Sequence, residues 1–197
     1  MNKALAVQHL STYELKHLST MIEVEAKVRL KKRDYDRLVK EIPKFAKAKG
    51  ESLKMDRYYG EGRVDLRIRE EGGEVVLGLK TRVLKKGVES NEEIEFPIDK
   101  PKKWDRLLRE NGFPLRMKKE KRCLSFRFKQ FTIELNSVKS LGKFLEIEHL
   151  VRSKSQVPQA RRGLVDLFGR LGFKPKDFER KFYIELLEEK RKNKKAR

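Results

Sequence analysis

Charged and apolar residues alternate along several short segments of this chain, and this alternation constrains its fold more than any other feature. In residues 22–29 every second side chain is charged, and the side chains between them are aliphatic. Successive side chains of a strand point to opposite faces, so such a segment has one charged face and one apolar face. The same pattern recurs in shorter segments, at residues 66–69, 77–82, 93–98, 133–135 and 145–148.

Two arrangements of such strands are physically reasonable. An open antiparallel sheet would pack its apolar face on helices and leave its charged face in water. A sheet closed into a barrel would instead turn the charged face inward and remove the exposed edges. The charged faces carry long side chains of both signs, and apolar helices are available to cover the other face, which favours the barrel. The solvated open face is the alternative.

The order of the predicted elements repeats once. The first half is predicted to contain a strand, a helix and three strands, at residues 22–30, 34–48, 52–59, 63–70 and 74–82. The second half repeats this order, at residues 92–98, 101–111, 115–128, 131–138 and 143–151. A helix over 156–171 and a last segment over 179–189 follow. We therefore predict an α+β protein: a closed antiparallel β-barrel covered by helices and built from a duplicated strand–helix–three-strand unit.

Three regions are expected along the chain. Residues 1–20 carry little pattern before the first regular strand, so we interpret them as an extension outside the core. The core domain is predicted to span residues 21–189. Residues 190–197 are rich in Lys and Arg and are expected to form a basic tail that frays from a helix.

The composition limits the chemical class of the binding partner but does not identify it. The chain has 50 Lys and Arg against 30 Asp and Glu, a formal charge of +20, which indicates an anionic partner. Nucleic acid, acidic lipid and small polyphosphates all fit this charge, and so does a Lys- and Glu-rich surface adapted to high temperature. No apolar run reaches the ~18–20 residues of a membrane helix. The one cysteine, Cys123, cannot form an internal disulfide, which favours the reducing cytoplasm.

A lumen that mixes cations with clustered carboxylates suits a specific chemistry. Lys and Arg alone would repel one another, whereas carboxylates among them can hold divalent metals, and the two together can hold a polyphosphate. Transfer of a phosphoryl group needs charge neutralisation and in-line positioning more than covalent help. Arg and Lys bind the remaining phosphate oxygens, Arg often through two hydrogen bonds.

Six motifs follow one another in a fixed order: EVEAK at 23–27, DRYY at 56–59, LRIR at 66–69, LKTR at 79–82, EIE at 93–95 and LGKFLEIE at 141–148. Together with FYIELL at 182–187, they resemble the CYTH superfamily, the triphosphate tunnel metalloenzymes. The first motif matches the ExExK signature of that family. The resemblance covers residues 21–189 and is strongest to the class IV adenylate cyclase branch. Thiamine triphosphatases, inorganic triphosphatases and fungal RNA triphosphatases are other members of the superfamily.

The resemblance implies roles for the charged residues. A catalytic role is implied for Glu23, Glu25 and Lys27. Contacts to the triphosphate are implied for a set of basic residues: Lys27, Arg67, Arg69, Lys80, Arg82, Lys121 and Arg122. Ligands of Mg²⁺ or Mn²⁺, direct or through water, are implied among the carboxylates: Glu23, Glu25, Glu93, Glu95, Glu146 and Glu148.

Three departures from the family pattern are visible. Asn136 stands where many members have an acidic residue, and Gly60 stands where Asp is usual. Cys123 occupies the expected arginine position of a Lys-x-Arg strand. Either a bulge turns Arg122 into the lumen, or that phosphate contact is missing. Cys123 itself is expected to be a small buried filler.

These observations lead to an expected function. We expect a divalent-metal-dependent enzyme that acts on a triphosphate: either a class IV adenylate cyclase-like enzyme that converts ATP to cyclic AMP, or a hydrolase of thiamine triphosphate, tripolyphosphate or nucleoside triphosphates. The alternative is a non-enzymatic polyphosphate- or RNA-binding protein, which has no need of paired glutamates inside basic faces. Neither a membrane nor nucleic acid is the expected partner. An apolar outer face left uncovered by helices would favour a homodimer.

Overall fold

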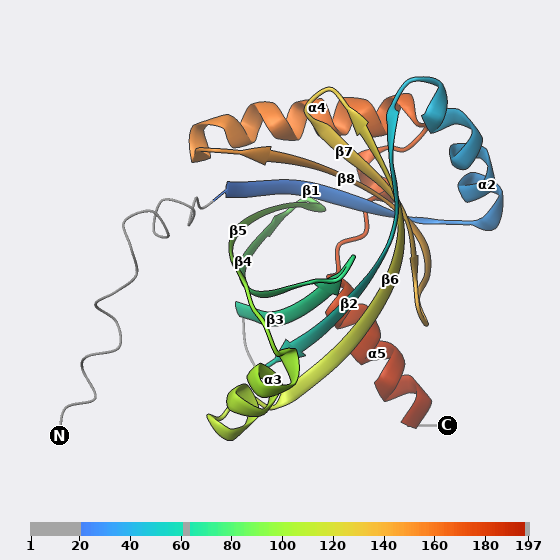
Figure 1. Ribbon diagram of the computed structural model, residues 1–197. Coiled ribbons are helices and arrows are strands. Elements are labelled where there is room, and N and C mark those ends of the chain that lie inside the picture. The colour runs from blue at the N-terminus through green and yellow to red at the C-terminus, as the bar shows by residue number, and fades with distance from the viewer. Residues whose placement is uncertain (1–20, 61–63, 196–197) are drawn as a thin grey trace.

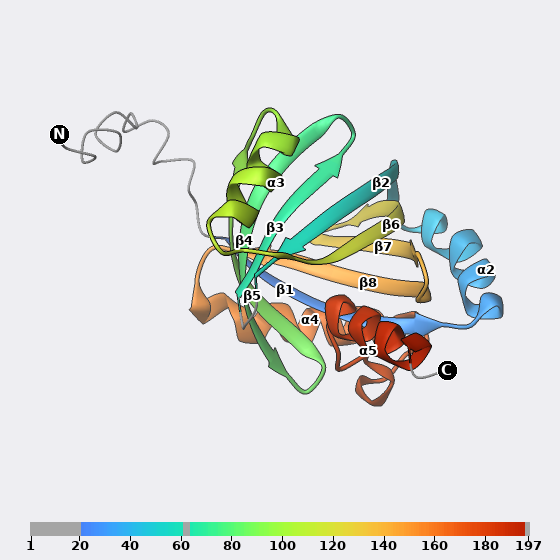
Figure 2. The same cartoon turned by 90° about the horizontal axis from the view of Figure 1, so that it is seen from below.

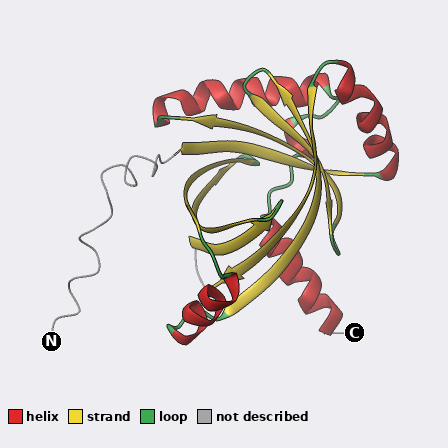
Figure 3. Ribbon diagram, viewed as in Figure 1, coloured by secondary structure: helices red, strands yellow, loops and turns green. Residues whose placement is uncertain are grey.

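A closed antiparallel β-barrel forms the body of the protein (Figures 1 and 3). The computed structural model describes residues 21–60 and 64–195. The strands are β1 (Met21–Leu30), β2 (Lys47–Tyr59), β3 (Val64–Glu71), β4 (Glu74–Lys85), β5 (Val88–Pro97), β6 (Leu115–Phe128), β7 (Phe131–Val138) and β8 (Gly142–Val151). Around the barrel they follow the order β1-β5-β4-β3-β2-β6-β7-β8, and β8 pairs with β1 to close it. The predicted closed barrel is confirmed.

The helices lie outside this barrel (Figure 3). They are α2 (Lys32–Glu41), α3 (Pro101–Glu110), α4 (Val157–Arg170) and α5 (Tyr183–Lys195). Short 3-10 turns lie at Ile42–Lys44, Lys154–Gln156 and Pro175–Asp177. Within the described residues, none of these helices combines the length and the hydropathy needed to cross a membrane.

The predicted duplication is visible in the strand order. β1-α2-β2-β3-β4 and β5-α3-β6-β7-β8 have the same sequence of elements. If every strand is replaced by the one four places further along the chain, each neighbour relation in the barrel is reproduced. The two halves therefore close the barrel with approximate two-fold symmetry, each supplying half of the lumen wall.

Two predicted boundaries differ from the structure. The helix expected over 34–48 ends at Glu41, and a 3-10 turn that contains Pro43 leads directly into β2 at Lys47. Proline has no backbone N–H and disfavours a continued helix, which explains the early end. The strand expected from residue 92 begins at Val88, because Lys86 and Gly87, both with positive φ, make a tight turn after β4.

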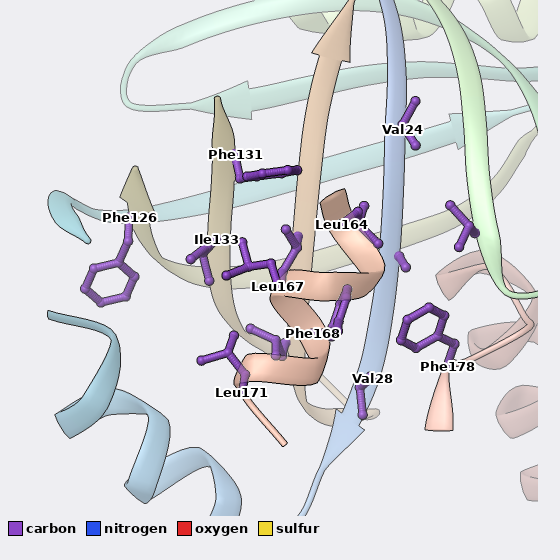
Figure 4. Packing of buried hydrophobic residues seen from close by; sticks show 14 of the residues in the cluster. Val24, Val28, Phe126, Phe131, Ile133, Leu164, Leu167, Phe168, Leu171 and Phe178 are labelled. Atoms are coloured by element: carbon purple, nitrogen blue, oxygen red, sulfur yellow. The ribbon is translucent and has the colours of Figure 1, made fainter. Parts of the chain in front are cut away.

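One apolar core lies between the barrel wall and α4 (Figure 4). Leu164, Leu167 and Phe168 of α4 are buried against the outward-facing aliphatic residues of β1, β7 and β8, among them Val24 and Ile133. The ring of Phe131 approaches α4 so closely that a Cβ atom at Gly163 would lie 2.9 Å from it. This packing explains why the apolar residues of β1 face outward and its charged residues face the lumen.

Within the described part of the chain, the outer face of β4 and β5 is covered by helix only near the start of α4 (Figure 1). Leu79, Val83 and Phe96 on this face are exposed, Val83 by 58%. This is the uncovered apolar face on which a second copy of the chain is expected to pack, and the homodimer stays a prediction.

The two ends of the chain bear on the predicted domain limits. Residues 1–20, interpreted as an extension, lie outside the described residues. At the other end α5 continues through most of the basic segment to Lys195, so the stretch from Lys190 to Lys195 is helical rather than a frayed tail. The split into a core over 21–189 and flanking segments is otherwise a proposal.

Candidate active site

A polar lumen runs through the barrel, and its lining comes from every strand. On β1, Glu23, Glu25 and Lys27 line it, while Val24 and Ala26 between them are buried on the helix side. The lining side chains are Glu23, Glu25, Lys27, Lys54, Tyr58, Arg67, Arg69, Lys80, Arg82, Glu89, Glu93, Lys119, Lys121, Glu134, Glu146, Glu148, Phe182 and Tyr183. The charged faces predicted from parity therefore converge in one enclosed space, and the alternative of an open, solvated face is wrong.

Three carboxylates meet at one position in the lumen. Oxygen atoms of Glu23, Glu25 and Glu148 all lie within 4.8 Å of one another. Burial, followed by the nearby charge of Glu23, raises the pKa of Glu148 well above its usual range, and burial and Glu25 raise the pKa of Glu23. Three hard oxygen donors that repel one another are what a divalent cation would relieve, so this cluster fits Mg²⁺ or Mn²⁺.

Lys80 is the cation next to this cluster. Its Nζ atom contacts the carboxylate of Glu23 and lies 2.8 Å from Glu93 and 3.5 Å from Glu25. Burial alone would lower the pKa of Lys80, but these carboxylates raise it well above its usual range. Lys80 therefore stays charged, and together with the carboxylates it forms a compact group of both signs.

A second group of both signs lies on β6, β7 and β8. The Nζ atom of Lys121 donates to Glu134 and to Glu146, at 2.8 Å each. Glu134 also accepts from Lys54 at 2.8 Å, and these two lysines outweigh the effect of burial and lower its pKa to well below the usual value. Asn136 donates to Glu146 at 2.6 Å. Glu146, predicted as a metal ligand, is therefore held by Lys121 and Asn136, apart from the carboxylate trio.

The third group is organised by a carboxylate that is completely buried. Asp56 accepts hydrogen bonds from Arg69 Nε at 2.7 Å and Nη2 at 3.1 Å, and it also forms an ion pair with Lys119 Nζ at 2.8 Å. The hydroxyl of Tyr58 donates to it at 3.2 Å. Asp56 thus fixes the orientation of two cations that line the lumen.

Aromatic rings from the start of α5 form part of the lumen wall, and Figure 2 shows α5 lying against the barrel. Lys27 Nζ lies 5.4 Å from the ring centre of Tyr183, and Lys119 Nζ lies 5.2 Å from it. The guanidinium of Arg82 lies 4.4 Å from the ring of Phe182. Such cation–π contacts stabilise the cations in addition to their carboxylate partners, which are Glu89 for Lys27 and Asp56 for Lys119.

Two of the predicted site residues lie outside this arrangement. Arg122 is exposed, because β6 and β7 pair without a bulge from Lys121 to Phe128 and Cys123 takes the inward position. The expectation that Arg122 contacts the substrate is therefore corrected. Glu95 lies on the lumen side of β5 but at the barrel edge, where it is 38% exposed and accepts from Arg67 at 2.8 Å.

Several lumen residues were not predicted as site residues. Glu89 contacts Lys27 and accepts from Asn91, and it was missed because the strand was predicted to begin only at residue 92. Lys119 and Lys121 lie two positions apart on β6, and Asp56 and Tyr58 lie two positions apart on β2, so each pair shares one face of its strand. The same alternation, followed along the full length of these strands, would have predicted Lys119 and Asp56 as well. The other lumen residues that were not predicted are Lys54, Tyr58 and Glu134 on the strands, and Phe182 and Tyr183, which lie at the start of α5.

The lumen is largely filled by its own side chains. Its free volume is about 60 Å³, well below the ~300–1,000 Å³ of usual small-molecule sites. The cations and carboxylates fill the rest of the space by pairing with one another. A bound polyanion therefore has to replace these internal ion pairs with its own, which the long Lys, Arg and Glu side chains allow by changing rotamers.

An antiparallel barrel with such an enclosed, mixed-charge lumen defines a tunnel protein. The model of the CYTH domain matches residues 21–183, and the chain belongs to the CYTH domain family.

Individual relatives agree with this assignment. A Methanocaldococcus jannaschii protein named "putative adenylate cyclase" is 28% identical over 178 residues, which cover 84% of this chain and 98% of that protein. The solved structure of the PH1819 protein of Pyrococcus horikoshii OT3 has 31% identity and a TM-score of 0.72, covering 85% of this chain and 99% of its own. A Hippeastrum protein, described as a "putative adenylyl cyclase" that reveals a dominant triphosphatase activity, has 19% identity and a TM-score of 0.56 over 76% of this chain and 88% of its own, and it shares the fold.

Proposed function

We propose that this protein is a divalent-metal-dependent enzyme that cleaves a phosphoanhydride bond of a triphosphate inside the tunnel. The observation that carries this proposal is the presence of the carboxylate trio Glu23, Glu25 and Glu148 in the same enclosed lumen as eight cationic side chains. Simple anion binding would need the cations alone. The carboxylates add the ligands for a metal, which the triphosphate needs for full neutralisation of its charge.

The chain's own residues would divide the work. Arg67, Arg69 and Lys80 would bind the phosphate oxygens, and the buried Lys27 would hold another of them. Glu23, Glu25 and Glu148 would hold Mg²⁺ or Mn²⁺, which supplies charge neutralisation at the phosphates when bound. Burial opposes ionisation of Glu25, but Lys80 lowers the pKa of Glu25 well below its usual range, so this carboxylate is ionised at neutral pH.

Two reactions fit this lumen. In cyclisation, the ribose 3′-oxygen bonds to the α-phosphorus, the α–β anhydride bond breaks and pyrophosphate leaves. In hydrolysis, a water oxygen bonds to the γ-phosphorus, the β–γ anhydride bond breaks, the diphosphate leaves and orthophosphate is formed. The relative named for adenylate cyclase, which covers most of the chain, supports cyclisation, whereas the Hippeastrum protein is an example of triphosphate hydrolysis in the same fold. The reaction is proposed to take place in the cytoplasm, where the single buried thiol is stable.

Product analysis tests this proposal. The full chain is incubated with ATP, thiamine triphosphate or tripolyphosphate, with Mg²⁺, with Mn²⁺ or with a chelator, and cyclic AMP, pyrophosphate and orthophosphate are measured. Glu148→Gln serves as the site variant. Glu92→Gln, an exposed carboxylate on the outer face of β5, serves as the matched control. We expect metal-dependent product that is lost in Glu148→Gln and kept in Glu92→Gln. Turnover in the chelator, or equal turnover in both variants, would contradict the proposal.

A further inference from the structure

The tunnel does not account for the positive charge of this protein. Eight cationic residues line the lumen, and they face seven carboxylates in the lining and the buried Asp56 behind it. The formal charge of the lumen is therefore zero. Even with Glu89 and Glu148 protonated, the lumen would hold only two of the +20 charges of the chain. The net charge lies on the outer surface.

A concentration of this outer charge lies where α5 meets β2, β6 and the turn between β7 and β8. A groove of about 400 Å³, here called the α5 groove, is lined there by Arg57, Lys118, Lys139, Met55 and Leu187, together with the carboxylate of Glu120. Glu120 is already paired with Lys139 at 2.7 Å. Arg57 is likewise paired with Glu70, so among the described residues the groove cation without a carboxylate partner is Lys118.

The end of α5 supplies further cations. Lys190, Arg191 and Lys194 follow Leu187 by three, four and seven positions, so they lie on the helix side that borders the groove. Lys190 Nζ contacts the carbonyl oxygen of Ser140, which also lines the groove, and Arg191 lies 3.5 Å from the carbonyl oxygen of Arg116. The segment predicted as a basic tail is thus a helical row of cations at the rim of a basic groove.

We propose that the α5 groove binds single-stranded nucleic acid. The row of cations would contact successive phosphates, and the side chain of Met55, which is 44% exposed, would contact bases. The expectation against nucleic acid depended on the glutamates between the basic residues, and those glutamates neutralise the lumen only.

Membrane binding and adaptation to heat fit this surface less well. A membrane-binding helix needs a free apolar face, but the apolar residues Tyr183, Ile184 and Leu187 of α5 are buried against the barrel. Adaptation to heat is achieved by networks of paired charges of both signs, whereas an unpaired excess of one sign destabilises the compact state.

The test measures binding of a fluorescein-labelled 15-nucleotide oligo-U with a 5′-hydroxyl, which offers no triphosphate to the tunnel, by fluorescence anisotropy with the full chain. The groove variant is Lys190→Gln/Arg191→Gln/Lys194→Gln. The matched control, Lys102→Gln/Lys103→Gln/Arg109→Gln, removes the same charge from exposed positions on α3, which lies away from α5 in Figure 2. Lys118→Gln is a second groove variant that leaves α5 intact. Arg69→Ala changes a residue that lines the tunnel and not the groove.

We expect the groove triple variant to bind the oligonucleotide about tenfold more weakly, with a salt dependence that is less steep by about two in log–log slope. Lys118→Gln is expected to weaken binding about threefold, while the α3 control and Arg69→Ala change it less than twofold. Equal loss in the groove and α3 variants would overturn the proposal, since binding would then depend on net charge alone. Equal competition by long-chain inorganic polyphosphate, or binding to anionic vesicles without binding to the oligonucleotide, would overturn it as well.

Discussion

The carboxylate of Asp56 holds Arg69 through two hydrogen bonds, from Nε at 2.7 Å and from Nη2 at 3.1 Å, and the side chain of Asp56 has no exposed surface. The same carboxylate pairs with Lys119. Two cations of the lumen are therefore oriented before any ligand binds. Both oxygens of this carboxylate are engaged and its position is fixed, so Asp56 determines the orientation of the Arg69 and Lys119 side chains.

Removal of this charge is expected to affect both stability and binding. Asp56→Asn keeps the size of the side chain but leaves Arg69 and Lys119 without a buried counter-charge. Breaking a buried ion pair by removing one partner costs about 3–5 kcal/mol of unfolding free energy. Urea unfolding should show a loss of this order, and titration calorimetry should show weaker binding of tripolyphosphate. Unchanged stability would show that water reaches these cations and replaces Asp56.

The pH dependence of the unfolding free energy should reveal the same interaction of Asp56 with Arg69 and Lys119. Burial would raise the pKa of Asp56, but Lys119 and Arg69 together hold it well below its usual range. A carboxyl whose pKa is lowered by folding stabilises the protein at pH values above its unfolded pKa of about 3.9, and this contribution is lost as the pH falls through the lower pKa of the folded state. Unfolding free energies measured from pH 7 to pH 2 should therefore fall less steeply in Asp56→Asn than in the natural protein. Parallel curves would contradict this.

Substitutions at two neighbouring residues of β6 should have very different effects on the affinity for tripolyphosphate. Lys121 is buried and donates to Glu134 and Glu146, whereas Arg122 is exposed on the outer side of the strand. Lys121→Gln should weaken tripolyphosphate binding at least tenfold, because it removes a lumen charge and releases two carboxylates. Arg122→Gln should change it less than twofold. Titration calorimetry measures both affinities side by side. If Arg122→Gln also lost binding, the outward position of Arg122 would be refuted.

Opposite effects on stability and metal affinity are expected for Glu148→Gln. Without metal, this change removes one of three mutually repelling buried carboxylates, so the melting temperature should rise or stay level. With metal, it removes a ligand, so the stabilisation by Mn²⁺ should shrink. Thermal melts with and without Mn²⁺ measure both. A lower melting temperature without metal, together with an unchanged response to Mn²⁺, would place the metal elsewhere.

Parity along the strands predicted much of this site. The alternation in residues 22–29 correctly assigns Glu23, Glu25 and Lys27 to the lumen, because the helices supply enough apolar surface to bury Val24 and Ala26 on the other side. The same reasoning applied to β3 and β4 correctly placed Arg67 and Lys80.

Other features depend on contacts between distant segments, which local patterns do not contain. Glu89 lies beyond the predicted start of its strand, which is extended by the turn at Gly87. Whether Arg122 or Cys123 faces inward depends on the register between β6 and β7. Phe182 and Tyr183 reach the lumen only because α5 packs beneath the barrel, so their role follows from tertiary structure.

The measurement that tests the tunnel most directly compares ligand-induced stabilisation by phosphates of different length. The full chain is melted with excess Mg²⁺ and with orthophosphate or tripolyphosphate, both at one concentration that is about a hundredfold above the dissociation constant of tripolyphosphate. A ligand at a hundredfold excess stabilises by about 2.7 kcal/mol, which for a chain of this size raises the melting temperature by roughly 5–11 °C. We predict such a rise for tripolyphosphate, a much smaller one for orthophosphate, and a reduced rise in Arg69→Ala. Equal shifts for the two phosphates, with no effect of Arg69→Ala, would contradict the account.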